Sequence, residues 1–232
     1  MASIKITATD KSGAFDAYLV EPKGKPAGAV VLIQEIFGVN QSLRDTAAYV
    51  ADLGFLVLAP DLFWRQEPGV DITDKSEAEW QKAFALMNGF NQDKGVEDLK
   101  ATLAVARTLP GGNGKAGTMG YCLGGRLAFM MATRSDADIN VSYYGVGIDG
   151  LLGELPAVRA PLLVHIAAED KYVPPEAQAK IVTATAGNPL VSTHVYAGAD
   201  HAFARVGGIH WHGLSAAIAN GRSAEALAAA LS

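Results

Sequence analysis

Two kinds of hydrophobic pattern alternate along this chain. Residues 29–33 (Ala-Val-Val-Leu-Ile) and 55–59 (Phe-Leu-Val-Leu-Ala) are short and uniformly apolar, which is typical of strands buried on both faces of a sheet. Between them, residues 41–53 place apolar side chains on one helical stripe. Repetition of this alternation predicts a mostly parallel sheet with helices on both faces. We predict about eight strands, at residues 4–7, 15–20, 29–33, 55–59, 116–119, 140–144, 161–167 and 191–196. The predicted helices are 41–53, 76–90, 94–108, 123–133, 174–186 and 214–231.

Three stretches depart from this simple alternation. Residues 4–7 and 15–20 alternate apolar with polar positions around the turn residues 10–13, which predicts a hairpin at one edge of the sheet. Residues 62–74 are rich in Pro, Gly and charge, and loops of this length often border active sites. Asn220-Gly221 lies inside the last helix, and we expect it to kink or fray that helix.

Composition narrows the functional classes. Half of the 232 residues are hydrophobic and 19% are charged, so we expect one globular domain over residues 1–232. The formal net charge of -5 and the lack of a basic tract argue against nucleic-acid binding. The single cysteine excludes an internal disulfide and a cysteine metal cluster. We see no signal-peptide core and no run near the about 18 apolar residues of a membrane span, so we expect a cytoplasmic protein.

The candidate chemistry centres on Gly120-Tyr-Cys122-Leu-Gly124. A predicted strand leads into this G-x-C-x-G arrangement and a predicted helix leads out, as in the nucleophile elbow of the α/β-hydrolase fold, with Cys in place of Ser. The tight turn requires small residues two positions before and two after the nucleophile. The helix N-terminus favours a thiolate and an oxyanion. A buried cysteine in a tight turn is the structural alternative.

An acid and a histidine follow later strands of the predicted sheet. Asp170 lies just past residues 161–167, and His201 lies just past residues 191–196. Cys122, Asp170 and His201 thus fall at the carboxyl ends of strands, in the order nucleophile, acid, histidine that this fold uses. We expect His201 to take the thiol proton and Asp170 to orient the imidazole.

The other candidates are weaker. His165 and His194 lie inside predicted strands, where core or solvent-facing roles are commoner. His210 and His212 resemble a metal pair, but no nearby carboxylate or cysteine completes a site, so we expect no metal and no cofactor. Glu169 is the rival acid, and we expect it to point away from the site.

Gln34-Glu35-Ile36-Phe37-Gly38 follows the buried strand 29–33, again at the carboxyl edge. The Glu35 carboxylate is either a helix cap or a part of the site. The N–H of Ile36 is expected to be the second oxyanion donor beside the N–H of Leu123, because this fold takes one donor after the nucleophile and one after an early strand.

Several motifs together resemble the dienelactone hydrolases (carboxymethylenebutenolidases). The resemblance extends over about residues 5–230 and is specific because the motifs occur jointly. The motifs are Gln34-Glu-Ile-Phe-Gly-Val-Asn40, Pro60-Asp-Leu62, Gly120-Tyr-Cys-Leu-Gly-Gly125, Tyr143-Tyr-Gly-Val-Gly147, Val173-Pro174 and His201-Ala-Phe-Ala-Arg205.

The resemblance implies hydrolysis of an unsaturated lactone from catechol degradation by a Cys122–His201–Asp170 triad. It also implies that Glu35 accepts the thiol proton when substrate binds and that Arg205 binds the substrate carboxylate. A carboxylate near Cys122 would keep the resting thiol protonated. An anionic substrate that engages Arg205 would release Glu35, which then becomes a stronger proton acceptor.

The chain departs from the family in the expected pocket wall. Trp80, with Lys82 nearby, stands where the family has a second arginine, and Phe84 and Met87 also differ from the family pattern. Ala202 stands where relatives can carry a hydroxyl. The expected substrate-binding residues are Arg205, Phe37, Tyr144, Trp80, Lys82, Phe84 and Phe203.

Three other functions are compatible with parts of this pattern. The first is a broader carboxylesterase for small aryl or alkyl esters on the same triad. The second is a thiol-based redox or stress protein with a reactive cysteine on an elbow, which needs no Asp170–His201 pair. The third is a catalytically silent binding domain, which an intact triad disfavours.

Overall fold

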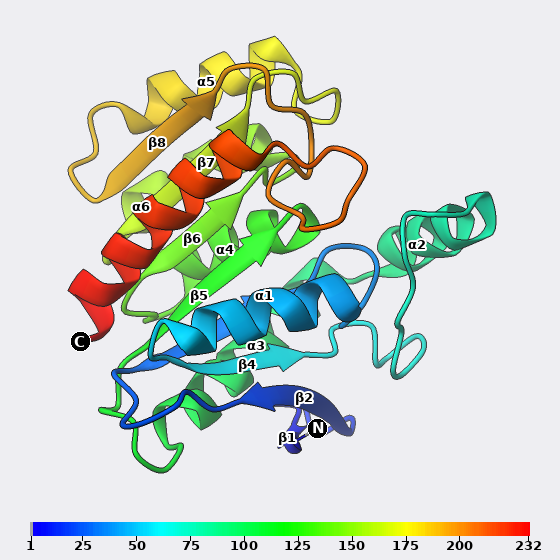
Figure 1. Cartoon of the computed structure of the whole chain (residues 1–232), viewed down its shortest axis with the longest axis vertical. Coiled ribbons are helices and arrows are strands. Elements are labelled where there is room, and N and C mark those ends of the chain that lie inside the picture. Colours follow the sequence, from blue (N-terminus) through cyan, green and yellow to red (C-terminus); the bar gives the residue numbers. More distant parts are fainter. Residues whose placement is uncertain (1) are drawn as a thin grey trace.

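The computed structural model describes residues 2–232. Eight strands form one sheet in the order β1-β2-β4-β3-β5-β6-β7-β8 (Figure 1). The strands are β1 (Ala2–Thr7), β2 (Ala14–Val20), β3 (Ala29–Ile33), β4 (Leu56–Pro60), β5 (Ala116–Tyr121), β6 (Asn140–Tyr143), β7 (Leu162–Ala167) and β8 (Val191–Tyr196). The helices are α1 (Gln41–Asp52), α2 (Glu77–Gly89), α3 (Gln92–Arg107), α4 (Leu123–Arg134), the 3-10 helix η1 (Ile148–Ala157), α5 (Pro175–Thr185) and α6 (Gly213–Leu231).

The sheet is parallel from β4 to β8, and the first two strands form the antiparallel edge. β1 pairs with β2, and β2 with β4, in antiparallel register, whereas the other neighbours run parallel. The predicted edge hairpin and the predicted parallel sheet are therefore confirmed. Strand β3 lies between β4 and β5, so the chain adds β4 on one side of β3 and β5 to β8 on the other side. Ligands of open α/β sheets bind at such a switch point, outside the carboxyl ends of the strands.

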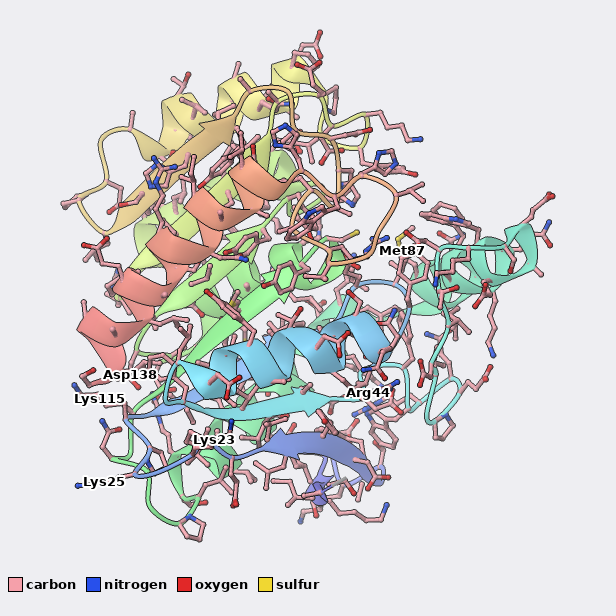
Figure 2. The ribbon with its side chains drawn as sticks, viewed as in Figure 1. Lys23, Lys25, Arg44, Met87, Lys115 and Asp138 are labelled. Atoms are coloured by element: carbon pink, nitrogen blue, oxygen red, sulfur yellow. The ribbon has the colours of Figure 1, made fainter. Side chains whose placement is uncertain are left out.

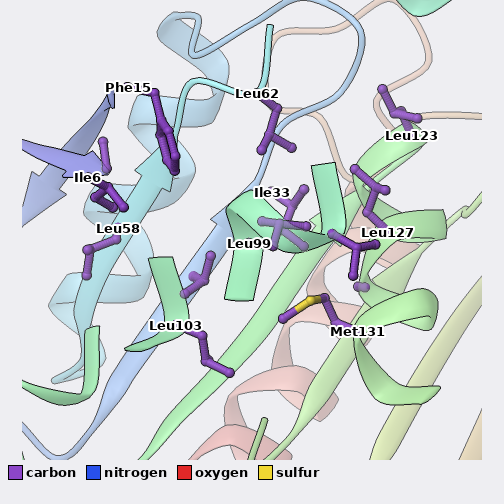
Figure 3. Close-up of a cluster of buried hydrophobic side chains, with 14 of the residues drawn as sticks. Ile6, Phe15, Ile33, Leu58, Leu62, Leu99, Leu103, Leu123, Leu127 and Met131 are labelled. Atoms are coloured by element: carbon purple, nitrogen blue, oxygen red, sulfur yellow. The ribbon is translucent and has the colours of Figure 1, made fainter. Parts of the chain in front are cut away.

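Helices cover both faces of the sheet. In Figure 1, α1 and α6 lie in front of the sheet, and α3 and α4 lie behind it. Strand β3 needs helices on both faces because all of its side chains are apolar. Val31 and Ile33 join the core under α3 and α4, whereas Val30 and Leu32 join the core under α1 and α6. Figure 3 shows the first of these cores. Its labelled members are Ile6, Phe15, Ile33, Leu58, Leu62, Leu99, Leu103, Leu123, Leu127 and Met131.

Two features differ from the sequence-based expectation. Helix α6 is continuous across Asn220-Gly221, because Asn220 accepts a hydrogen bond from the buried Tyr143 hydroxyl at 2.9 Å, which holds this part of the helix on the sheet. Helix η1 was not predicted. Its glycines and Pro156 break the apolar periodicity of an α-helix, and the element closes by short 3-10 turns instead.

A buried polar network fastens α6 to the sheet. His165 of β7 contacts the Tyr196 hydroxyl through Nδ1 at 2.8 Å and the Ser223 hydroxyl of α6 through Nε2 at 3.0 Å. The Tyr143 hydroxyl contacts the same Ser223 at 2.7 Å. Burial, together with the positive charges near it, lowers the pKa of His165 to about 3. The imidazole is therefore neutral in the folded protein near neutral pH.

This network predicts a loss of stability in acid. The unfolded histidine has a pKa near about 6.5, so between about pH 6.5 and 3 the unfolded chain binds one proton more than the folded chain. His165 should thus reduce the free energy of unfolding by about 1.4 kcal/mol for each pH unit of acidification in that window. His165→Gln, which cannot titrate, should show a shallower acid slope in urea unfolding followed at several pH values. Equal slopes for the two proteins would contradict this assignment.

Candidate active site

Cys122 lies on a strained turn between β5 and α4. Its backbone has φ 56° and ψ -113°, outside the regions that L-residues ordinarily adopt. Two glycines permit this turn. A Cβ at Gly120 would lie 2.0 Å from the Gly124 carbonyl oxygen, and one at Gly124 would lie 2.5 Å from the Ile33 oxygen. The predicted elbow, and the reason for its glycines, are confirmed.

Two backbone N–H groups near the thiol are free to bind an oxyanion. The N–H of Cys122 itself donates to Tyr143 O at 3.0 Å, so it is already used. The N–H groups of Leu123 and Ile36 donate to no other group within residues 2–232. Leu123 is the first residue of α4, so its N–H also benefits from the helix dipole.

His201 and Asp170 meet at the same edge of the sheet. The Nδ1 atom of His201 lies 2.7 Å from Asp170 Oδ2, and both side chains are buried. The other oxygen of Asp170 accepts the N–H of Tyr172 at 2.8 Å, which fixes the carboxylate. Glu169, the rival acid, is exposed to solvent as expected.

The histidine is also close to the thiol. Cys122 and His201 line one cavity. Burial alone lowers the pKa of His201, but the negative charge of ionised Cys122 and the contact with Asp170 outweigh burial and raise this pKa to about 10. A proton that leaves the thiol can therefore remain on the imidazole near neutral pH.

The cavity beside Cys122 has a mostly apolar wall. The rings of Trp80 and Phe84 stack at 5.5 Å, and the ring of Phe37 meets Trp80 edge-on at 5.1 Å. Figure 2 labels Met87, which lies where α2 faces the carboxyl ends of the parallel strands. Lys115 and Asp138, also labelled, lie at the amino ends of the strands, on the opposite side of the molecule. The lining residues are Ile36, Phe37, Trp80, Phe84, Met87, Cys122, Val146, Tyr172, His201 and Arg205.

Arg205 is held by two carboxylates at the rim of this cavity. Its Nε donates to Glu35 Oε2 at 2.6 Å, and its Nη1 donates to Asp74 Oδ2 at 2.5 Å. All three side chains are at most 10% exposed. Burial opposes the charge of the guanidinium, but Glu35 and Asp74 raise the pKa of Arg205, which remains a cation. Glu35 and Arg205 are expected members of the site. Asp74 is an addition, although the long loop that ends with it was expected to border the site.

Glu35 faces away from the thiol in this structure. It lines a second, small cavity with Tyr121, Tyr144 and residues of α1, and does not line the Cys122 cavity. Its Oε1 and the Tyr144 hydroxyl are buried without a partner among residues 2–232. Burial and the nearby Glu35 charge raise the pKa of Tyr144 well above its ordinary value, so the phenol keeps its proton.

Three residues expected to bind substrate lie outside the Cys122 cavity. Lys82 is turned to the surface, where its ammonium pairs with Glu67 at 2.6 Å, so we remove it from the candidate site. Phe203 is fully buried and packs against Tyr144 at a centroid distance of 5.5 Å. Tyr144 in turn packs edge-on against His201 at 5.1 Å, so these two rings support the site from below.

The histidines considered as metal ligands have other partners. His210 Nδ1 lies 3.0 Å from Asp200, and His212 caps α6 through Ser215. In the described part of the chain, no three His, Cys, Asp or Glu side chains are grouped to hold a metal ion. Among the helices of residues 2–232, none has the length and apolar character needed to cross a membrane.

A mostly parallel eight-stranded sheet with an elbow cysteine, an acid and a histidine after successive strands defines an α/β-hydrolase fold. A sequence profile described as the dienelactone hydrolase family matches residues 15–231. This chain belongs to the dienelactone hydrolase family.

Named relatives agree with this assignment. A putative carboxymethylenebutenolidase of Azospirillum brasilense is 53% identical over 226 residues, covering 97% of this chain and 96% of that protein. A carboxymethylenebutenolidase of Pseudomonas putida is 39% identical over 214 residues, covering 92% and 91%. The crystal structure of a putative dienelactone hydrolase from Klebsiella pneumoniae subsp. pneumoniae MGH 78578 superposes with a TM-score of 0.82 at 27% identity, covering 98% and 99%.

The geometry of the elbow predicts the effect of a single added methyl group. In Gly124→Ala the new Cβ would meet the carbonyl oxygens of Ile33 and Gln34 at 2.5 and 2.6 Å, so β3 and α4 must separate. We expect a loss of about 1–3 kcal/mol in the free energy of unfolding. Gly150→Ala is the matched control, because its Cβ meets nothing within 4 Å. Its stability should change by less than about 0.5 kcal/mol in denaturant unfolding. Equal stability of the two variants would refute the packing argument.

Proposed function

We propose that this protein hydrolyses the ester bond of a dienelactone-type unsaturated lactone through a Cys122–His201–Asp170 triad. The observation that carries the proposal is the 2.7 Å contact between His201 and Asp170 at the cavity that also contains the elbow thiol. The carboxymethylenebutenolidase relatives support the lactone as the substrate. We extend the proposal to a role in aromatic degradation in the cytoplasm, where an unpaired cysteine such as Cys122 is kept reduced.

The residues suit a two-step acyl transfer. The thiolate of Cys122 attacks the lactone carbonyl, and the N–H groups of Leu123 and Ile36 bind the resulting oxyanion. Collapse of the tetrahedral intermediate breaks the ring C–O bond, and the imidazolium of His201 protonates the leaving oxygen. Water then gives a proton to His201 and attacks the thioester. The carboxylic acid leaves, and the thiolate is regenerated.

Glu35 fits the role of a substrate-controlled base. In the free protein Arg205 binds Glu35 Oε2, and the carboxylate lies outside the Cys122 cavity. A substrate carboxylate that engages Arg205 would compete for the guanidinium and release Glu35. The freed carboxylate would then accept the thiol proton, so the nucleophile would ionise only when substrate is bound.

The apolar wall favours a second candidate on the same triad. Trp80, Phe84 and Met87 line the cavity and offer no charge to a substrate. A carboxylesterase with broad activity toward small neutral esters would use this wall directly. The ratio of kcat/KM for a dienelactone to that for 4-nitrophenyl acetate separates the two functions, because a lactone-specific enzyme favours the first substrate.

Replacement of the triad tests hydrolysis itself. Cys122→Ala and His201→Ala should each lower kcat/KM for a dienelactone and for 4-nitrophenyl acetate by about a thousandfold or more. The control is His194→Ala, which removes a histidine inside β8 and should retain the wild-type rate.

The redox alternative makes a different prediction. A thiol-based redox protein would show no esterase turnover in the wild type. Peroxide oxidation of Cys122, followed by mass spectrometry, should persist in His201→Ala. Unimpaired ester hydrolysis in either triad variant would refute the proposed mechanism.

Substrate-dependent ionisation of Cys122 can be observed directly. Thiolate absorbance near 240 nm, measured at neutral pH, should rise when a non-hydrolysable carboxylate-bearing lactone analogue is added. Glu35→Gln should abolish that rise because the amide cannot accept the thiol proton. If the thiolate fraction is the same with and without the analogue, Glu35 is not a substrate-controlled base.

A further inference from the structure

The carboxylate of Asp74 occupies one side of the only arginine in the Cys122 cavity. Arg205 is the sole Lys or Arg among the residues that line this cavity. Its Nη1 already donates to Asp74 while its Nε donates to Glu35. With one cation and two carboxylates in a nearly buried cluster, the formal charge of the cluster is negative before any substrate arrives.

The structure holds Asp74 firmly in this place. The indole N–H of Trp80 donates to the Asp74 carbonyl oxygen at 3.0 Å. One residue earlier, the backbone N–H and the hydroxyl of Thr73 donate to Glu79 Oε1 at 2.8 and 3.0 Å. Trp80, which stands where the family has an arginine, therefore adds no positive charge to the pocket. Instead, its hydrogen bond helps to hold the Asp74 carboxylate on Arg205.

We propose that Asp74 is a specificity-determining residue that competes with a substrate carboxylate for Arg205, so that it lowers the preference of the site for acidic over neutral lactones and esters. The proposal rests on the hydrolase function proposed above and specifies the substrate class. It follows from the contacts of Asp74 and from the apolar wall formed by Trp80, Phe84 and Met87.

Two effects of Asp74 act in the same direction. An incoming carboxylate would have to displace Asp74 from Nη1 or lie beside it, where the two like charges repel each other in a nearly buried site. Asp74 also gives Arg205 a permanent counter-ion. When Glu35 is released, the guanidinium is therefore not left unpaired, so a substrate carboxylate gains less at Arg205 than it would gain at an unpaired buried cation.

The charge preference can be measured with two substrates, one of which carries a carboxylate and the other its neutral methyl ester. We would compare kcat/KM for the dienelactone acid and for its methyl ester, with ring opening followed by loss of the lactone absorbance. The ratio of acid to ester should rise about tenfold or more in Asp74→Asn, because the isosteric amide cannot repel the carboxylate. Asp74→Ser should shift the ratio in the same direction, which guards against a folding defect in either variant.

Asp71→Asn is the matched control. Asp71 lies in the same loop and pairs with Arg44 at 2.8 Å, but neither residue lines the Cys122 cavity. Its acid-to-ester ratio should equal that of the wild type. A merely structural role of Asp74 would slow both substrates in parallel, so an unchanged or lower ratio in the Asp74 variants overturns the proposal.

Binding separates this proposal from the hydrolase function. Calorimetric Kd values for a lactam analogue as free acid and as methyl ester report the charge preference without chemistry. If the Asp74 variants shift the Kd ratio toward the acid while no ester is hydrolysed, the assignment of Asp74 stands and the proposed function fails. In the reverse result, the protein hydrolyses esters but the Kd ratio does not change in the Asp74 variants. That result refutes the role of Asp74 and leaves the proposed hydrolase function standing.

Discussion

The close approach of α4 to the end of β3 determines the geometry of the site. No side chain fits between them, since even a methyl group at Gly124 would meet the carbonyl oxygens of Ile33, the last residue of β3, and of Gln34. The turn that this contact demands holds Cys122 at φ 56°. That backbone lifts the thiol above the sheet and leaves the first N–H of α4 free. The hydrophobic cores on both faces supply the burial that maintains the strained turn.

Charges around the thiol are arranged in two separate groups. His201 and Asp170 form one, next to the Cys122 thiol. Arg205 with Glu35 and Asp74 forms the other, at the rim of the same cavity. The Phe37 ring lies 4.9 Å from the guanidinium carbon of Arg205, and this side chain is only 8% exposed, so its charge is satisfied by these acids more than by solvent. Both groups thus reach one pocket, the first through His201 and the second through Arg205.

Much of this arrangement could be predicted from the sequence because its signals are local. Several buried strands appear as uniform apolar runs, and Cys122, Asp170 and His201 each follow a predicted strand, so the parallel sheet brings them to one edge. The direction of a long side chain is not a local property. Lys82 and Trp80 lie half a turn apart on α2, and only the packing of this helix decides that Trp80 enters the pocket and Lys82 meets Glu67. Asp74 escaped prediction because it follows no strand directly: it lies in the long loop before α2, and its partner Arg205 is 131 residues away.

The pocket wall and the nucleophile are built on different parts of the architecture. Helix α2 extends beyond the sheet in Figure 1, whereas Cys122 stands on its central strand β5. Trp80, Phe84 and Met87 all come from α2, and only two residues of this helix are fully buried, Ala83 and Leu86. Directed evolution of new substrate ranges should therefore concentrate its libraries on residues 74–89. The proposed triad, Cys122, His201 and Asp170, lies outside that segment.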